Sequence, residues 1–382
     1  MIKTFYWCPY ISDVATVKAV LNSAKSIKRY SNNRIEPSII NVVGEWNEKK
    51  NLLRENNINL VDFKNKNIIK FLPKLGFIFS RFTYVVIFFF SVLKLHKLLK
   101  KEQPDYLIVH LITFIPLFLL IFFNYKTKFI LRISGYPKLN LFRSTIWRSI
   151  KNKIYLVTCP TNLTLKLLQD KNIFTPEKLY YLPDPILEVK KINFKKKKIL
   201  ELDGFSKDNS ILSIGRLTKQ KNFNFLINCF KDINVLYPQF NLYILGEGEQ
   251  RGYLQKKINQ LNLKDKIFLI GYKKNVYQYL NNCKLFILTS NYEDPGFVLI
   301  EAGFMNKTVI TSDCPNGPEE IIENNKNGNL FKNNSKEDFL RVFEEVINKA
   351  DQDLHLKRIG LKKKCKEFTL FSHYSKLNKL LN

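Results

Sequence analysis

Two acidic residues stand on either side of a Pro-Gly pair in the stretch "TSNYEDPGFVLIEAG", residues 289–303. The stretch follows an apolar strand pattern, and the Pro-Gly pair predicts that a helix begins near Phe297. The first amides of a helix lack internal partners and carry partial positive charge, so they can hold phosphate or hydroxyl oxygens beside Gly296, which has no side chain. Carboxylates accept paired hydrogen bonds from hydroxyls, which makes Glu293 and Glu301 candidates for binding a sugar and a ribose. The alternative is two surface acids that cap a helix.

A basic pair follows another strand pattern in "SIGRLTKQKNF", residues 213–223. Arg216 and Lys221 are five positions apart across a turn, so both can face one ligand, and Gly215 would let the backbone approach that ligand. Arginine binds phosphate through its planar fork and lysine binds it as a point charge. The pair could therefore neutralise a diphosphate without a metal. The alternative is a solvated pair.

His110 ends the apolar run "YLIVH", residues 106–110. Ligands of parallel sheets bind at the carboxyl ends of the strands, so a histidine at this end is a candidate for ligand contact. A buried structural histidine is the alternative. No metal site is predicted, because the chain has no CxxC pair and only four histidines.

Strand and helix patterns alternate in two successive blocks, which predicts an α/β protein with two Rossmann-like, doubly wound parallel sheets facing each other across a cleft. The strands of the first block are predicted at 2–7, 38–43, 58–63, 106–111, 128–134 and 155–161. The strands of the second block are predicted at 210–215, 241–246, 267–271, 285–290 and 308–313. The lysine-rich residues between the blocks predict a linker. The expected domains are 1–190 and 210–365, joined by a linker at 191–209.

The segment 75–101, "LGFIFSRFTYVVIFFFSVLKLHKLLKK", is dense in phenylalanine and ends in lysines. Arg81 interrupts its apolar stretch, and a clean membrane span needs about 20 apolar residues. A helix that lies on a membrane surface explains the apolar face and the basic end together. The alternative is a long buried helix of the first domain.

The formal net charge is +29. Such a surplus favours an anionic partner, which could be nucleic acid, an anionic membrane face or a phosphorylated substrate. A surface shaped by codon bias is the alternative. Basic and aromatic residues do not alternate as they do in RNA-binding modules, so no nucleic-acid partner is expected. The N-terminus enters a strand pattern directly, which predicts a cytoplasmic chain without a signal peptide.

The second half resembles the retaining glycosyltransferases of the large glycogen-synthase-like family four, also called glycosyltransferase group 1, which have the GT-B fold. The resemblance is carried by "IGRLTKQKNFNFLI", "ILGEGEQ", "SNYEDPGFVLIEAG" and "TVITSDCPNGPEEII" with "NGNLF" after it, over about 210–331. The first half matches more loosely, through "PDYLIVHLIT" and "RISGYPKLN". The chain looks like the subset that builds bacterial surface polysaccharides.

The resemblance implies a role for each candidate residue. Arg216 and Lys221 would bind the donor diphosphate, Glu301 would bind the ribose, and Glu293 would contact the donor sugar. The amides near Gly296 and Phe297 would contact that sugar as well, and His110 would touch it near the scissile bond. The tail, 366–382, would be a helix that returns to the first domain.

The resemblance also implies a metal-independent hexosyltransferase without a cofactor. It would move a hexose or N-acetylhexosamine, with retention, from a nucleotide sugar, expected to be a UDP-sugar, to a lipid-linked or cell-surface saccharide. Together with segment 75–101, it implies an enzyme held peripherally at the inner face of the cytoplasmic membrane.

One departure concerns the acceptor. Many relatives have a glycine-rich loop after the first strand, where this chain has "PYISDVATVKAV", 9–20. Asp13 and Thr16 are therefore only candidates for acceptor contacts. Two competing functions remain open at this point: a nucleotide-sugar epimerase on the same fold, and a non-catalytic basic protein that binds membranes or nucleic acid.

Overall fold

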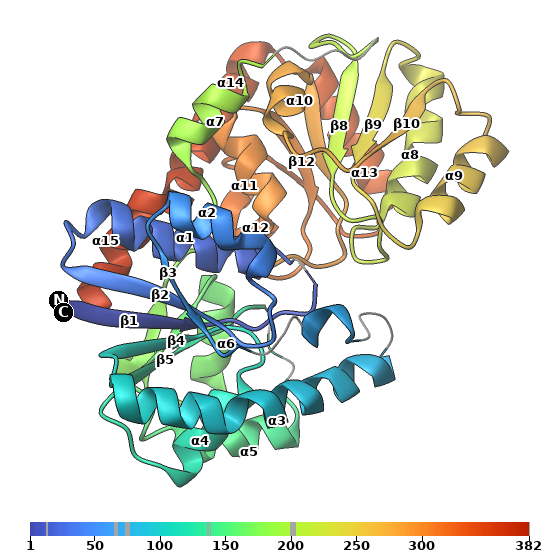
Figure 1. Ribbon diagram of the computed structural model, residues 1–382. Helices are drawn as coiled ribbons and strands as arrows, with labels where there is room; N and C mark the ends of the chain where they lie inside the picture. Colours follow the sequence, from blue (N-terminus) through green and yellow to red (C-terminus); the bar gives the residue numbers. More distant parts are fainter. Residues whose placement is uncertain are drawn as a thin grey trace. The chain divides into compact units, whose positions relative to one another are not determined.

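The computed structural model divides the chain into two compact units (Figure 1). Unit 1 comprises Met1–Ile186 and Leu370–Asn382, and unit 2 comprises Leu187–Thr369. The structure describes residues 1–12, 14–64, 68–72, 77–135, 137, 139–198 and 204–381, without the side chains of 77–81.

The described part of unit 1 is built on a seven-stranded parallel sheet in the order β3-β2-β1-β4-β5-β6-β7. Its strands are β1 (Ile2–Trp7), β2 (Ile35–Asn41), β3 (Asn59–Asp62), β4 (Tyr106–Val109), β5 (Lys128–Arg132), β6 (Leu156–Cys159) and β7 (Leu179–Tyr181). Tyr6 of β1 lies opposite Ile39 on one side and Ile108 on the other. The central strands are apolar along nearly their whole length because helices cover both faces of the sheet.

The helices of unit 1 form a layer on each face of this sheet (Figure 1). They are α1 (Ala15–Tyr30), α2 (Lys50–Glu55), α3 (Phe77–Glu102), α4 (Phe114–Phe122), α5 (Leu141–Ile150), α6 (Asn162–Asp170) and α15 (Leu370–Leu380). One apolar core holds side chains of α1 and α15 with those of β1 and β2, and the opposite core holds side chains of α3, α4 and α5. The tail therefore packs in unit 1, through α15.

The described part of unit 2 has a six-stranded parallel sheet in the order β10-β9-β8-β11-β12-β13. Its strands are β8 (Ser210–Ile214), β9 (Asn241–Leu245), β10 (Ile267–Gly271), β11 (Leu285–Leu288), β12 (Thr308–Ser312) and β13 (Asn329–Phe331). Its helices are α7 (Val189–Lys195), α8 (Phe223–Leu236), α9 (Arg251–Gln260), α10 (Tyr277–Asn282), α11 (Phe297–Phe304), α12 (Pro318–Ile322), α13 (Lys336–Asn348) and α14 (Asp351–Cys365). Two doubly wound parallel domains confirm the predicted fold class.

The strand order reverses once in each sheet, between β1 and β4 in unit 1 and between β8 and β11 in unit 2. Connections leave such a point in opposite directions, which opens a crevice at the carboxyl ends of the two strands. The basic-pair loop follows β8, the two-glutamate segment follows β11, and His110 follows β4. The order of the strands therefore brings the candidate residues to the reversal points.

The unit boundaries differ from the sequence-based expectation, and unit 2 ends at Thr369 rather than at the expected 365. Two further differences lie between the units. The first unit ends at Ile186 rather than at 190, and the segment expected to be a linker, 191–209, begins inside helix α7. The reason is Ile192, which lies in the lysine-rich stretch but is buried in unit 2. The short edge strands β7 and β13 were not predicted either, since three residues carry too little periodicity.

Candidate functional site

The loop after β8 and the segment after β11 are bonded to each other in unit 2. The Asn291 amide donates to the Gln220 carbonyl at 2.8 Å, and the Thr289 hydroxyl donates to the Lys221 carbonyl at 3.2 Å. These bonds join residues about 70 positions apart in the sequence. The two motifs found separately in the sequence therefore form one site.

The Lys221 ammonium forms an ion pair with Oε1 of Glu293. The two side chains are 13% and 6% exposed, so water screens the pair little. The Ser290 hydroxyl also donates to Glu293 Oε1, at 2.5 Å. Lys221 and Glu293, to which the sequence assigns different ligand groups, thus contact each other directly.

Gly215 makes room for the Lys221 side chain. A Cβ atom at position 215 would lie 3.1 Å from three carbons of the Lys221 stem. A second glycine, Gly246 after β9, lets the backbone pass close to the same loop. A Cβ at Gly246 would lie 1.8 Å from the Gly215 carbonyl oxygen. The observed contact of Gly215 is thus with Lys221, whereas the sequence suggested backbone approach to a ligand.

Arg216 lies in the same loop as Lys221 but, unlike the Lys221–Glu293 pair, it is not buried. Its side chain is exposed, and no ion pair is present for it among the residues that the structure describes. The loop thus presents one available guanidinium beside one paired lysine. A guanidinium binds two oxygens of a phosphate at once.

Gly296 precedes α11 with φ of +94°, a backbone conformation that favours glycine. A Cβ there would make an ordinary 3.5 Å contact with Glu293, so the glycine is needed for its backbone and not for space. Phe297 is the first residue of α11 and is half-buried. The Leu299 amide donates to the Gly296 carbonyl at 3.1 Å, so the amides of Phe297 and Val298 are those that remain for a ligand at the start of α11.

Glu301 lies one turn inside α11 and is 5% exposed. The Tyr277 hydroxyl of α10 donates to Glu301 Oε1 at 2.9 Å. Burial, with the neighbouring Glu301 charge, raises the pKa of Tyr277, so the hydroxyl keeps its proton and remains a donor. No sequence motif marked Tyr277, because the contact depends on how α10 packs on α11.

His110 follows β4 in unit 1 and is 6% exposed. Its ring stacks on Tyr6 with centroids 6.1 Å apart, and its Nδ1 atom has no hydrogen-bond partner among the described residues. Burial, followed by the charges of Arg132 and His373, holds the pKa of His110 well below its ordinary value. The imidazole is therefore neutral near pH 7 and can donate or accept a hydrogen bond.

A small cavity lies beside His110, entirely within unit 1. Polar side chains line part of it: Ser23, His110, Arg132, Thr158, Asp184 and His373. The Arg132 guanidinium donates to Asp184 at 2.6 Å and to the Leu182 carbonyl at 2.6 Å. These bonds fix the chain segment that leaves unit 1.

The two acceptor candidates follow β1. Thr16 lies in the first turn of α1 and is half-buried. Asp13 lies outside the described residues. The sequence motifs thus converge within unit 2, while His110 and Thr16 belong to unit 1.

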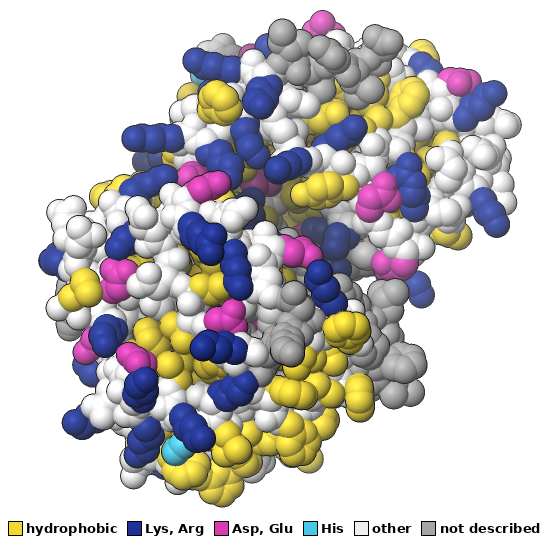
Figure 2. All heavy atoms as spheres, in the orientation of Figure 1, with side chains coloured by type: hydrophobic (Ala, Val, Ile, Leu, Met, Phe, Trp, Pro, Cys, Tyr) yellow, Lys and Arg dark blue, Asp and Glu magenta, His cyan; other side chains and the backbone are white. Residues whose placement is uncertain are grey.

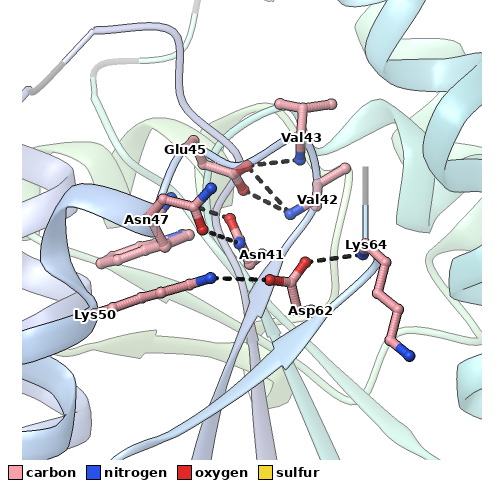
Figure 3. Close-up of polar contacts among 9 residues, drawn as sticks. Asn41, Val42, Val43, Glu45, Asn47, Lys50, Asp62 and Lys64 are labelled. Atoms are coloured by element: carbon pink, nitrogen blue, oxygen red, sulfur yellow. Dashed lines mark hydrogen bonds and ion pairs between the residues drawn. The ribbon is translucent and has the colours of Figure 1, made fainter. Parts of the chain in front are cut away.

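A buried carboxylate that the sequence did not single out organises the loop after β2 (Figure 3). Glu45 is 5% exposed and accepts hydrogen bonds from the amides of Val42, at 3.0 Å, and Val43, at 2.8 Å. Burial raises the pKa of Glu45 to about 7, against the lowering effect of these amides. The Tyr10 hydroxyl donates to the Glu45 carbonyl at 2.5 Å, which ties this loop to the one after β1.

The same view shows a second carboxylate at this edge of the sheet (Figure 3). Asp62 pairs with Lys50 at 3.3 Å and accepts from the Lys64 amide at 2.8 Å. Both carboxylates thus have partners in their own unit. Among the residues that the structure describes, no group of three or more His, Cys, Asp or Glu side chains could hold a metal ion.

Comparison with known proteins finds a family that part of the chain resembles. Residues 194–363 match the family "Glycosyl transferases group 1", which covers most of unit 2. An uncharacterised glycosyltransferase of Methanocaldococcus jannaschii, MJ1059, is 31% identical over 247 residues. The aligned part is 60% of each chain, so this chain spans about 60% of the length of that relative.

Two further similarities bear on the fold and the substrates. An N-acetylgalactosaminyltransferase of Campylobacter jejuni, named for an acceptor linked to diphospho-undecaprenol, is 35% identical over 126 residues, 33% of this chain and 34% of that one. HepE of Anabaena, solved in complex with UDP, superposes with a TM-score of 0.70 at 16% identity and covers 99% of both chains. The chain thus resembles the glycosyl transferases group 1 family over most of unit 2, and it has the GT-B fold of two parallel α/β domains.

Proposed function

We propose that the chain is a metal-independent, retaining glycosyltransferase. It moves a hexose or N-acetylhexosamine from a nucleoside-diphosphate sugar, with UDP as the nucleotide, to a lipid-linked or cell-surface saccharide. The observation that carries this proposal is the reversal point of unit 2, where Arg216, the Lys221–Glu293 pair and Glu301 gather beside the start of α11. Retention is taken from the family.

The cations act on the leaving group. Cleavage of the sugar–phosphate bond builds negative charge on the departing diphosphate, and a fixed cation stabilises that charge more in the transition state than before it. Arg216 binds the diphosphate with its available guanidinium. Lys221, held in place by Glu293 and by the space at Gly215, adds a second positive charge without the need for a metal.

The carboxylates act on neutral hydroxyls. The Tyr277 hydroxyl donates to Oε1 of Glu301, and in this proposal the Glu301 carboxylate accepts from a ribose hydroxyl. Lys221 and Ser290 occupy Oε1 of Glu293, and its Oε2 accepts from a hydroxyl of the donor sugar. The amides at Gly296 and Phe297 contact the same sugar.

The neutral imidazole of His110 forms a hydrogen bond with the donor sugar. Its lowered pKa argues against a role as a cationic acid. Thr16, with Asp13, is proposed to contact the acceptor. Thr16 lies in the first turn of α1, after β1, at the reversal point of the unit 1 sheet.

The known relatives support the substrate class. HepE binds UDP on the same fold, and the Campylobacter jejuni relative is named for a lipid-linked acceptor. An acceptor of this kind lies at a membrane. We therefore place the enzyme peripherally at the inner face of the cytoplasmic membrane, attracted by its basic surface, and we expect no nucleic-acid partner.

The test is donor hydrolysis by the purified chain, since many transferases slowly hydrolyse their donor. A panel of nucleotide sugars is incubated with and without EDTA, and the release of nucleoside diphosphate is measured. We expect release from at least one UDP-sugar, unchanged by chelation, and about 10²- to 10³-fold slower release by Arg216→Gln. Arg341→Gln, which removes an arginine of an exposed ion-pair cluster on α13, is the control. Loss of release in EDTA and recovery with Mg²⁺ would contradict the role of the basic pair.

A further inference from the structure

Helix α3 has two unlike sides along its described part. A line of residues spaced by four is fully buried against unit 1: Thr83, Ile87, Ser91, Leu95 and Leu99. The other side leaves large apolar side chains in solvent, with Phe89 71% and Leu93 69% exposed. Folding of unit 1 thus buries only half of this helix.

The exposed side continues onto α4, which packs on α3, and then onto α5, which packs on α4. The ring of Phe88 lies 5.8 Å from that of Phe114, whose ring lies 5.9 Å from that of Phe142. Phe142 is 67% exposed. We call this surface the aromatic face; its most exposed members are Phe82, Phe89, Leu93, Phe122, Leu141 and Phe142. Figure 2 shows hydrophobic side chains gathered over this part of unit 1.

Such a face is uncommon on a protein that works alone in water. Single exposed apolar residues are ordinary, but a continuous group contributed by three helices marks a docking surface. The charges around the face indicate its occupant.

The charge of unit 1 favours an anionic occupant. Unit 1 has 31 Lys and Arg against 11 Asp and Glu, a net charge of +20, whereas unit 2 has 31 against 22, a net charge of +9. Between residues 77 and 153, which include the aromatic face, the sequence has 13 basic residues and two acids. A second copy of the chain would bring a like charge against this face. An anionic lipid surface complements both the charge and the exposed rings.

Polar bonds show how α3 would meet that surface. Phe82–Glu102 is long and apolar enough to cross a membrane, the one such stretch among the described residues. However, the Lys94 ammonium donates to the Phe63 carbonyl at 2.7 Å, and His96 Nδ1 and the Tyr125 hydroxyl hydrogen-bond at 2.7 Å. The helix is therefore fastened to unit 1 along one side and can offer only the other.

We propose that the aromatic face lies in the plane of an anionic bilayer and inserts its outer rings between the lipid headgroups. This inference deepens the proposed membrane association. It assigns the contact to three helices rather than to segment 75–101 alone, and to apolar insertion as well as charge. An acceptor with a lipid anchor would then be presented at the surface on which unit 1 sits.

The experiment uses the full-length chain and vesicles of phosphatidylglycerol and phosphatidylcholine. All three native tryptophans are buried, so a tryptophan placed on the surface reports its own surroundings. We expect Phe89→Trp to shift its emission to the blue on these vesicles and to be quenched by brominated lipid. Leu236→Trp, at an exposed position on α8 of unit 2, should show neither change.

A second pair of variants measures the contribution to binding. Leu93→Ser should weaken vesicle sedimentation by about tenfold, because one apolar side chain no longer leaves water. Leu236→Ser is the matched control, since Leu93 and Leu236 are 69% and 68% exposed. Donor hydrolysis in the absence of vesicles should be unchanged in both.

The outcomes separate the two proposals. If Leu93→Ser binds vesicles as well as wild type does, and the tryptophan at position 89 is not quenched, the aromatic face is not the membrane contact. The membrane association itself would then still stand. Absence of wild-type binding to any vesicle would overturn both, while leaving the transferase activity to its own assay. Concentration-dependent dimers of the wild type that Leu93→Ser abolishes would assign the face to a second copy instead.

Discussion

Lys221 and Glu293 form an ion pair across 72 positions of sequence, buried in unit 2 and joined by the Ser290 hydroxyl. The pair sets the charge that a donor would meet. The lysine does not stand alone in front of a diphosphate, and the glutamate does not stand alone in front of a sugar. A substitution at either position therefore changes the other.

We expect the two positions to be coupled in stability. Lys221→Met leaves a buried carboxylate without its cation, and Glu293→Gln leaves a buried ammonium without its anion. Removing one partner of a buried pair costs about 3–5 kcal/mol, so each single variant should be clearly destabilised and the double variant less than the sum. Urea unfolding of the four proteins measures the coupling. Additive losses would mean that the pair does not form in solution.

Gly215→Ala tests whether the space under Lys221 matters. The new methyl group would press on the Lys221 stem at 3.1 Å, so the ammonium should shift and donor turnover should fall, with little change in overall stability. Gly252→Ala on α9 is the control, because a Cβ there meets nothing within 4 Å. Equal turnover in both variants would show that Lys221 tolerates the crowding.

Tyr277→Phe tests how Glu301 is positioned. The hydroxyl donates to one carboxylate oxygen of Glu301, and its loss removes a bond that orients that side chain. A hydrogen bond to a charged group contributes about 1.5–3 kcal/mol, so nucleoside diphosphate should bind ten- to a hundredfold more weakly. Calorimetry measures this binding, with Tyr279→Phe on the same helix as control. In the background of Glu301→Gln the tyrosine change should have little further effect; a full additional loss would rule out the coupling.

Stability should fall in acid because of a buried histidine. His373 of α15 is 3% exposed; its Nδ1 donates to the Pro183 carbonyl at 2.7 Å, and Ser23 donates to its Nε2 at 2.8 Å. Burial, the largest cause, lowers the pKa of His373 to about 3. Between the ordinary pKa of 6.5 and that value, the unfolded chain binds a proton that the folded chain does not. The free energy of unfolding therefore decreases as the pH falls through this window.

The size of this effect is at most about 1.4 kcal/mol for each pH unit and each such histidine, and His110 acts in the same direction. His373→Gln should lose less stability than wild type between about pH 7 and about pH 5, whereas His355→Gln, at an exposed position on α14, should follow wild type. Urea unfolding at both pH values measures the difference. Parallel losses in wild type and His373→Gln would exclude His373 as a source.

Much of the fold could be predicted because local patterns determine it. The strands that begin at 210, 241, 267, 285 and 308 lie where the sequence predicted them. Short apolar runs between amphipathic stretches leave few alternatives to buried parallel strands. The sequence did not predict the edge strand β7 or the helix α7, because each depends on a packing partner far away in the chain.

The sequence motifs nominate the residues of the candidate site but do not predict the contacts among them. Motif spacing brought Arg216 and Glu301 to strand ends, which parallel sheets turn into a site. The bonds from Tyr277 to Glu301 and from Lys221 to Glu293 join segments 24 and 72 positions apart, and no local pattern encodes them. Helix α3 shows the same division. The sequence predicted an apolar helix, but which of its residues are buried depends on how it packs in unit 1.

The central claim is that Glu301 binds the ribose and Glu293 binds the donor sugar, and comparing variants of the two residues tests it most directly. Glu301→Gln and Glu293→Gln are compared by calorimetry with nucleoside diphosphate and by initial rates with the complete donor sugar, after unfolding curves confirm that both fold. We predict that Glu301→Gln weakens diphosphate binding by about ten- to a hundredfold, because the ribose is present in both ligands. Glu293→Gln should weaken diphosphate binding less than Glu301→Gln does and lower turnover more, because it keeps the Lys221 charge and removes a carboxylate that only the complete donor contacts. Equal loss of diphosphate binding in both variants would contradict the assignment of Glu293 to the sugar.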